Sequence, residues 1–415
     1  MDSSSVSNVT PSFTQLERRY DIDWLRIIAI FLVFIYHGTR FFDAEDWHLR
    51  NAETSPMITG YMSFLTAIGM PLFFTIAGLG TFYAMGFLEA REIRGRNYVF
   101  LRFIRLMIPF AIGLVTHITI QVYLERISTG VFSGSFFKFY PTYFNGLYGF
   151  NGGNFAFYGH HLWFLVLLFI FTLLTYNLFS FMRKEKRRKG MAKFAKFFTI
   201  PGMIYLFPLP LFFLEFIYTI FLTDIPRFGG WNIISLLILY IYGFILAYDK
   251  QFKETIKRHV KVSFFIGILS AVTLGILINY KFDELFITPP EGFSYIILLF
   301  WFFRSIFAWS WLIVILYAGE KYLNKESKAR KYLNELVLPF YILHQTLLIV
   351  IGFFIIGLNI AIIWKYLIII SSSSAGIFLL LIIIREFNSL RFLFGMRVKR
   401  EKGLLRFLRK EKVVE

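Results

Sequence analysis

Residues 20–42 read YDIDWLRIIAIFLVFIYHGTRFF, and this stretch decides the class of the protein. An unbroken apolar run, residues 27–36, lies between Arg26 and His37. A helix of about 20 mostly apolar residues crosses the hydrocarbon core of a bilayer. The stretch therefore predicts a membrane-spanning helix with a cation at one edge and an imidazole deeper in the membrane.

The composition of the whole chain extends this conclusion. Of its 415 residues, 57% are hydrophobic and 17% are charged, whereas soluble domains average about 45–50% and roughly 25%. Further apolar runs predict an all-α, polytopic bundle of about ten transmembrane helices. The expected spans cover residues 24–43, 57–86, 98–123, 162–182, 197–221, 231–248, 262–280, 294–319, 336–357 and 361–384.

Cysteine is absent from the chain. Its absence excludes disulfide bonds, thiolate ligands for zinc or iron–sulfur clusters, and any mechanism that attaches a group to a cysteine. The sequence also lacks the metalloprotease motif HExxH, the Walker phosphate loop and the GxSxG nucleophile motif. We therefore expect neither a metal site nor a permanently bound cofactor.

Basic residues alternate along the chain in step with the predicted spans. With the N-terminus placed inside, the cytosolic segments, including both tails, hold 33 Lys and Arg residues, and the outward segments hold 5. This bias follows the positive-inside rule, which predicts a cytoplasmic-membrane protein with both termini in the cytosol. Topology and lipid headgroups account for the formal net charge of +18, so we expect no nucleic-acid partner.

The domain organisation follows from the same pattern. Residues 1–20 are Ser- and Thr-rich and read as a disordered cytoplasmic tail, whereas 21–386 form the membrane domain. A basic cytoplasmic tail is expected over 387–415. The sizeable outward segment is 124–161, and connections of this length are usually functional.

Arg26 and His37 are spaced by 11 residues, about three helical turns, so they lie on one helix face about 16 Å apart in height. Ionisable residues within a membrane are costly and indicate functional sites. A structural interpretation is also open: Arg26 would extend to lipid headgroups, and His37 would hydrogen-bond to a neighbouring helix.

Arg102 and Arg105 share a face of the third span, near its cytosolic end. Two guanidinium groups at this spacing repel each other unless an anion lies between them, and phosphate suits their forked donors. Lipid headgroups are the alternative ligand. Other polar residues within spans are open to structural or functional roles: His117, Gln121, Glu215, Arg304 and His344.

These residues favour two classes of function. A cationic cytosolic mouth, an imidazole within the membrane and a polar outward loop suit group transfer from a phosphorylated donor to an external acceptor. A transporter or flippase of an anionic metabolite or lipid-linked molecule needs similar residues but breaks no bond. A signalling or scaffold protein is a third interpretation, which predicts no donor binding.

Eight ordered motifs resemble the integral-membrane acyltransferase-3 family, and within it the glucan biosynthesis protein C-like subgroup. The resemblance extends from Tyr20 to about Glu386. The motifs are YDIDWLR (20–26), YHGTRFF (36–42), DWHLRNAE (46–53), MPLFFTIAGLGTFYAM (70–85), RFIRLMIPFAIG (102–113), QVYLERISTGVFSGSFFKFYP (121–141), HHLWFL (160–165) and PFYILHQ (339–345).

The resemblance implies a membrane O-acyltransferase. Such an enzyme takes an acyl group, for example acetyl or succinyl, from cytosolic acyl-CoA. It delivers the group to a hydroxyl of an extracytoplasmic carbohydrate such as a glucan. Acyl-CoA is then a donor substrate, and the bilayer and the carbohydrate are the other partners.

The resemblance also assigns roles to residues. The family's Arg and His of the first helix fall on Arg26 and His37, and its paired arginines fall on Arg102 and Arg105. His37 would be the catalytic residue, as general base or transient acyl acceptor, and the arginines would hold the coenzyme's phosphates. Three further residues match recurrent family positions and would line the acyl path and the acceptor side: His344, His161 and Trp163.

Overall fold

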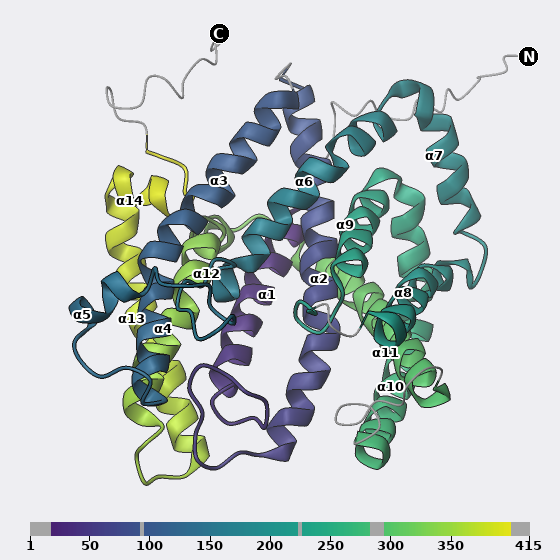
Figure 1. Ribbon diagram of the computed structural model, residues 1–415. Helices are drawn as coiled ribbons and strands as arrows, with labels where there is room; N and C mark the ends of the chain where they lie inside the picture. Colours follow the sequence, from purple (N-terminus) through teal and green to yellow (C-terminus); the bar gives the residue numbers. More distant parts are fainter. Residues whose placement is uncertain (1–17, 92–94, 223–225, 283–293, 400–415) are drawn as a thin grey trace, which may run out of the picture.

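The computed structural model describes residues 18–91, 95–222, 226–282 and 294–399. Within these ranges the protein is a helical bundle, which confirms the predicted fold class (Figure 1). Nine described helical segments are long and apolar enough to cross a membrane, and a tenth apolar helix is shorter. The helices are α1 (Tyr20–Thr39), α2 (Pro56–Glu89), α3 (Gly95–Val115), α4 (His117–Ser128), α5 (Phe136–Thr142), α6 (Trp163–Met182), α7 (Glu185–Phe197), α8 (Pro208–Phe221), α9 (Ile233–Tyr248), α10 (Lys250–Phe282), α11 (Tyr295–Ala318), α12 (Lys328–Ile355), α13 (Ile362–Glu386) and α14 (Asn388–Leu393), with the short turns η2 (His160–Leu162), η3 (Met203–Leu206) and η5 (Gly319–Leu323).

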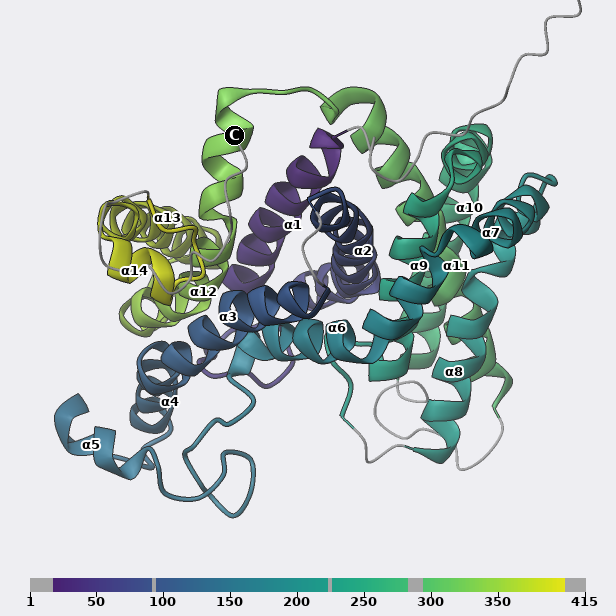
Figure 2. The ribbon, with the colours of Figure 1, turned by 90° about the horizontal axis from the view of Figure 1, so that it is seen from above.

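Helices α1 and α2 occupy the middle of the bundle (Figure 2). Helices α12 to α14 lie on one side of them and α8 to α11 on the other, while α3 packs along α6. We call the end that carries α7 the basic end. The opposite end, formed by residues 40–55 and the turn between α12 and α13, is called the loop end (Figure 1).

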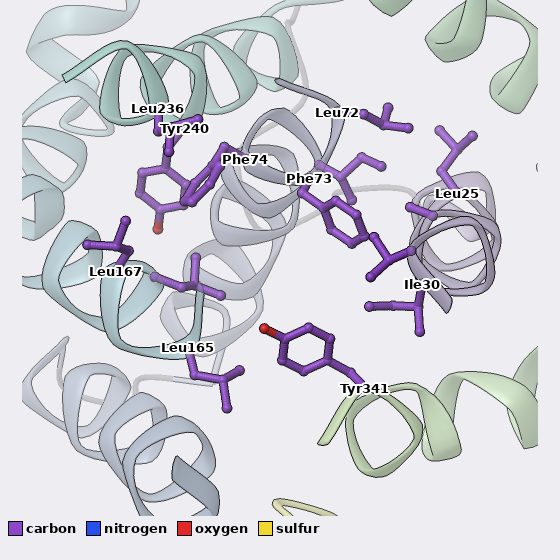
Figure 3. Packing of buried hydrophobic residues seen from close by; sticks show 14 of the residues in the cluster. Leu25, Ile30, Leu72, Phe73, Phe74, Leu165, Leu167, Leu236, Tyr240 and Tyr341 are labelled. Carbon is purple, nitrogen blue, oxygen red and sulfur yellow. The ribbon is translucent and has the colours of Figure 1, made fainter. Parts of the chain in front are cut away.

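The core of the bundle is built around α2. In Figure 3, Phe73 on α2 points toward Ile30 on α1, while Phe74 points toward Tyr240 on α9. All four side chains are buried. Neighbouring positions on α2 therefore pack against different helices.

Helices α2 and α9 approach closely at two glycines. A Cβ atom on Gly78 would collide with the backbone of Tyr240 and Phe244, and one on Gly243 would collide with the backbone of Thr75. Small residues at such contacts let helix backbones approach in a membrane, where lipid removes the hydrophobic driving force for association.

We expect Gly78→Ala to destabilise the protein by about 1–3 kcal/mol, because the added methyl group pushes α9 away from α2. Gly69→Ala is the matched control on the same helix, since a Cβ atom there meets nothing within 4 Å. Thermal unfolding of the two purified variants in detergent measures the difference. Equal unfolding midpoints would contradict the close contact.

The third predicted span, 98–123, lies within one candidate span, Gly95–Ser128, which is divided into two helices. Helix α3 ends at Val115 and α4 begins at His117, and Thr116 between them has φ −118° and ψ −71°. The Thr116 hydroxyl donates to the Ile112 carbonyl at 2.7 Å, a contact that bends helices.

Two segments predicted as connections contain helices. Helix α7 lies between the fourth and fifth predicted spans, and within the span 197–221 the short turn η3 precedes α8, which begins at Pro208. Within the predicted tail 387–415, α14 packs against α3. Residues 1–17 and 400–415 of the two predicted tails lie outside the described residues.

Candidate active site

Three histidines from three different elements meet inside the bundle. His37 lies on α1, His344 on α12 and His161 in the turn η2 that precedes α6. The ring centroid of His344 lies 5.0 Å from that of His37 and 4.9 Å from that of His161. Among the described residues, no group of three or more His, Cys, Asp or Glu side chains is arranged to hold a metal ion.

The hydrogen-bond partners assign the ring protons of His344 and His37. His344 Nδ1 lies 2.6 Å from the Tyr341 carbonyl oxygen, which can only accept, so Nδ1 carries the proton. Its Nε2 therefore accepts from His37 Nδ1, 3.2 Å away. The Val33 carbonyl also lies 2.9 Å from His37 Nδ1. Both contacts place the proton of His37 on Nδ1 and leave Nε2 as its basic nitrogen.

His161 is fixed against α12 by two hydrogen bonds. Its Nε2 donates to the Ile342 carbonyl at 3.2 Å, and its own carbonyl accepts a hydrogen bond from the Tyr341 hydroxyl. Its Nδ1 is buried and has no partner within the described chain. The basic nitrogen of this buried ring is therefore unpaired.

Arg102 is held by hydroxyl groups at the basic end. Its Nε donates to the Tyr98 hydroxyl at 3.1 Å, and its Nη2 donates to Thr81 Oγ1 on α2 at 2.9 Å. Thr81 Oγ1 lies 2.7 Å from the Tyr240 hydroxyl on α9. These bonds fix the guanidinium group but leave its positive charge without a carboxylate partner among the described residues.

Arg26 lies between α1, α2 and α12. Its Nη1 lies 3.4 Å from Asn334 Oδ1 and 3.6 Å from Asp23 Oδ1, and the guanidinium group lies against Gly80 on α2. Asp23 has a closer partner, because its Oδ2 accepts from Arg330 Nη1 at 2.5 Å. One carboxylate is thus shared between two cations.

Arg105 completes a cluster of cations. It has no hydrogen bond or ion pair within the described chain, and the strongest charges acting on it are those of Arg26, Arg102 and Arg397. The nearby carboxylate, Asp23, is already paired. Like charges at this density leave a net positive site that a multiply charged anion would neutralise.

Other residues named from the sequence make contacts outside the group of three histidines. The Trp163 ring packs against Phe228, 5.2 Å between centroids. Glu215 forms an ion pair with Arg227, and Arg304 lies over the rings of a tryptophan-rich cluster near α8. Gln121 and His117 belong to contacts that join α4 to α12 and to the C-terminal segment.

Two residues that the sequence reasoning passed over meet at the loop end. His48 Nδ1, in segment 40–55, lies 2.5 Å from Glu125 Oε2 on α4. The sequence contained a signal for each of these two residues. Glu125 is the only acidic residue in 124–161, and His48 lies within the quoted motif DWHLRNAE.

Comparison with known proteins identifies the family. A family model described as an acyltransferase domain matches residues 19–385. No curated protein and no solved structure matches the chain. The match decides between the two classes of function in favour of an enzyme that transfers acyl groups other than aminoacyl groups. The protein is therefore a multi-pass membrane enzyme and belongs to the acyltransferase-3 family.

Proposed function

We propose that the enzyme moves an acyl group from acyl-CoA in the cytosol to a carbohydrate hydroxyl on the other side of the cytoplasmic membrane. The acyl group is small, such as acetyl or succinyl, and a glucan is the proposed acceptor. The basic end faces the cytosol in this proposal, in agreement with the positive-inside bias. The loop end then faces the acceptor.

The observation that carries the proposal is which ring nitrogen of His37 holds the proton. Its Nδ1 is fixed by Val33 and His344, and its Nε2 keeps a lone pair. An imidazole held in this way acts as a base or a nucleophile toward a thioester or a hydroxyl. The hydrogen bond to His344 orients the His37 ring in either role.

The arginine cluster supports coenzyme A as the carrier of the acyl group. Arg26, Arg102 and Arg105 act electrostatically on one another and lack sufficient carboxylate partners in the described chain. The phosphates of coenzyme A supply the missing negative charge. Arg26 and His37 are about 16 Å apart along α1, a separation that the extended arm of the coenzyme bridges between its phosphates and its thioester.

The remaining candidate residues take supporting positions. His344 orients His37, and His161 contributes an unpaired nitrogen beside it. Trp163 begins α6 and packs toward the connection between α8 and α9, so we assign it to the wall of the acceptor side.

Reconstitution into vesicles tests this function directly. The donor is acetyl-CoA labelled either in the acetyl group or in the coenzyme, and a glucan oligosaccharide enclosed on the opposite side is the acceptor. We expect acetyl label, but not coenzyme label, to become covalently attached to the oligosaccharide with release of one thiol per ester. Intact acetyl-CoA inside the vesicles and no ester would contradict the proposal and support transport.

A further inference from the structure

A second polar cluster lies at the loop end, near the histidines of the candidate active site. His48 Nδ1 contacts Glu125 Oε2 at 2.5 Å, and the Tyr148 hydroxyl donates to both oxygens of Glu125 at 2.9 and 2.8 Å. Arg126 lies next to the same carboxylate, with Nη1 3.4 Å from Oε1. The side chains of His48 and Glu125 are each 10% exposed.

The contacts assign the protons of this cluster. Burial and the charge of Glu125 raise the pKa of Tyr148, so its hydroxyl stays protonated and donates. The Glu125 carboxylate therefore accepts from Tyr148 and from His48 Nδ1. His48 Nε2 receives no hydrogen bond from any described residue and carries a lone pair. A carboxylate behind an imidazole fixes its tautomer and stabilises its protonated form.

Segment 40–55, which carries His48, is held by several bonds. Lys365 Nζ donates to Asn51 Oδ1 at 2.7 Å, and the Asn51 amide donates to the Phe41 carbonyl at 2.8 Å. At the start of the segment, Arg40 Nη1 contacts Asp43 Oδ2 at 2.5 Å. The segment thus positions His48 before any substrate binds, as catalytic groups require.

His160 closes the cluster with a strained backbone. Its φ is +45°, and that of the preceding Gly159 is +75°. A non-glycine residue in this region costs of order 1–3 kcal/mol, and such strain concentrates at functional sites. The strain holds the His160 ring 4.3 Å from that of His48 and 4.8 Å from that of Tyr148. Its Nε2 is buried without a partner among the described residues, and a bound hydroxyl group would supply one.

The cluster adjoins His37 through one aromatic ring. The Trp47 ring lies 6.4 Å from that of His37 and 5.5 Å from that of His48. His160 and His161 are consecutive, so the same turn of backbone places one histidine in each cluster. His48 therefore lies on the loop-end side of His37, where the proposed function places the acceptor.

We propose that His48 is the general base that removes the proton from the acceptor hydroxyl, with Glu125 as its positioning residue, and that His37 carries the acyl group between donor and acceptor. This inference rests on the proposed function, and it assigns the two steps of acyl transfer to two different imidazoles. A general base at His48 indicates an alcohol as the acceptor class. A neutral amine is already nucleophilic and does not require such a base.

The two half-reactions balance. In the first, His37 Nε2 attacks the thioester carbonyl carbon, the carbon–sulfur bond breaks, and a coenzyme A thiolate leaves an acyl-imidazolium that keeps its Nδ1 proton. In the second, the acceptor oxygen bonds to the acyl carbon while its proton passes to His48 Nε2, and the bond from the acyl carbon to His37 breaks. His48 then releases its proton to solvent at the loop end, and the thiolate takes one from the cytosol.

Separate assays of the two half-reactions test the inference. Exchange of labelled coenzyme A into acetyl-CoA reports the first. Transfer to glycerol, a small alcohol, and to hydroxylamine, a nucleophile that needs no base, reports the second. In His48→Gln we expect glycerol esterification to fall by at least about 100-fold, while exchange and hydroxamate formation persist. Glu125→Gln should show the same pattern with a smaller loss.

His259→Gln is the matched control, because His259 is buried on α10 and its two nitrogens bond to Gly202 and Thr255. Wild-type glycerol esterification in His48→Gln would overturn the inference. Equal loss of all three reactions in both His48→Gln and Glu125→Gln would also overturn it, because the cluster would then be structural. Absence of exchange and of acyl transfer in the unmodified enzyme would instead overturn the proposed function.

Discussion

Replacing His37 with alanine is expected to lower acyl transfer by at least about 100-fold, because the variant lacks the nitrogen proposed to react with the thioester. Affinity for coenzyme A should persist, since the arginines proposed to hold its phosphates are unchanged. Initial rates with acetyl-labelled acetyl-CoA measure the first effect, and calorimetric titration of coenzyme A into the purified protein measures the second.

His259→Ala is the control for this variant. His259 is buried, at 6% exposure, and lies on α10 with both nitrogens bonded. It should retain activity. A folded His37→Ala protein with undiminished transfer would exclude His37 from the reaction, whatever the activity of the control.

The double variant Arg102→Ala, Arg105→Ala is expected to lose affinity for coenzyme A by about 100-fold or more. Each hydrogen bond to a charged group contributes about 1.5–3 kcal/mol, and every 1.4 kcal/mol is a factor of ten in binding. The dissociation constant should also depend less on salt in the variant, because two cations have been removed. Titration of coenzyme A at two ionic strengths measures both effects.

Arg96→Ala provides the matched control on the same helix. Arg96 precedes Arg105 by nine residues, which places it on the opposite face of α3, where it lines a groove with Phe100 and Phe169. Its removal should leave coenzyme affinity unchanged. If Arg96→Ala weakened binding as much as the double variant, the arginines would act through general surface charge, and a specific phosphate site would be excluded.

Features that depend on one helix could be predicted from the sequence. Lipid requires each span to be long, apolar and internally hydrogen-bonded, so apolar runs locate the helices. Helical periodicity then fixes which residues share a face, as for Arg26 and His37 on α1 or Arg102 and Arg105 on α3. The division between α3 and α4 at Thr116 was not predicted, because a single hydroxyl group within an apolar run is a weak signal.

Contacts between helices could not be predicted in the same way. A soluble helix shows its buried face as an apolar stripe, but these helices are apolar on all sides, so no stripe reveals the partner. The contact between His37 and His344 joins positions 307 residues apart, and that between His48 and Glu125 joins positions 77 apart. Neither spacing carries a local signal.

The sequence by itself therefore determined a membrane bundle, its expected orientation, and the cation and imidazole on the first helix, because each depends on local composition and helical geometry. Only the tertiary structure decided which nitrogen of His37 is basic, since His344 on α12 contributes to that assignment. It also decided that a carboxylate on α4 lies behind His48. Both pairings arise from side-chain packing between distant segments, which no property of a single helix encodes.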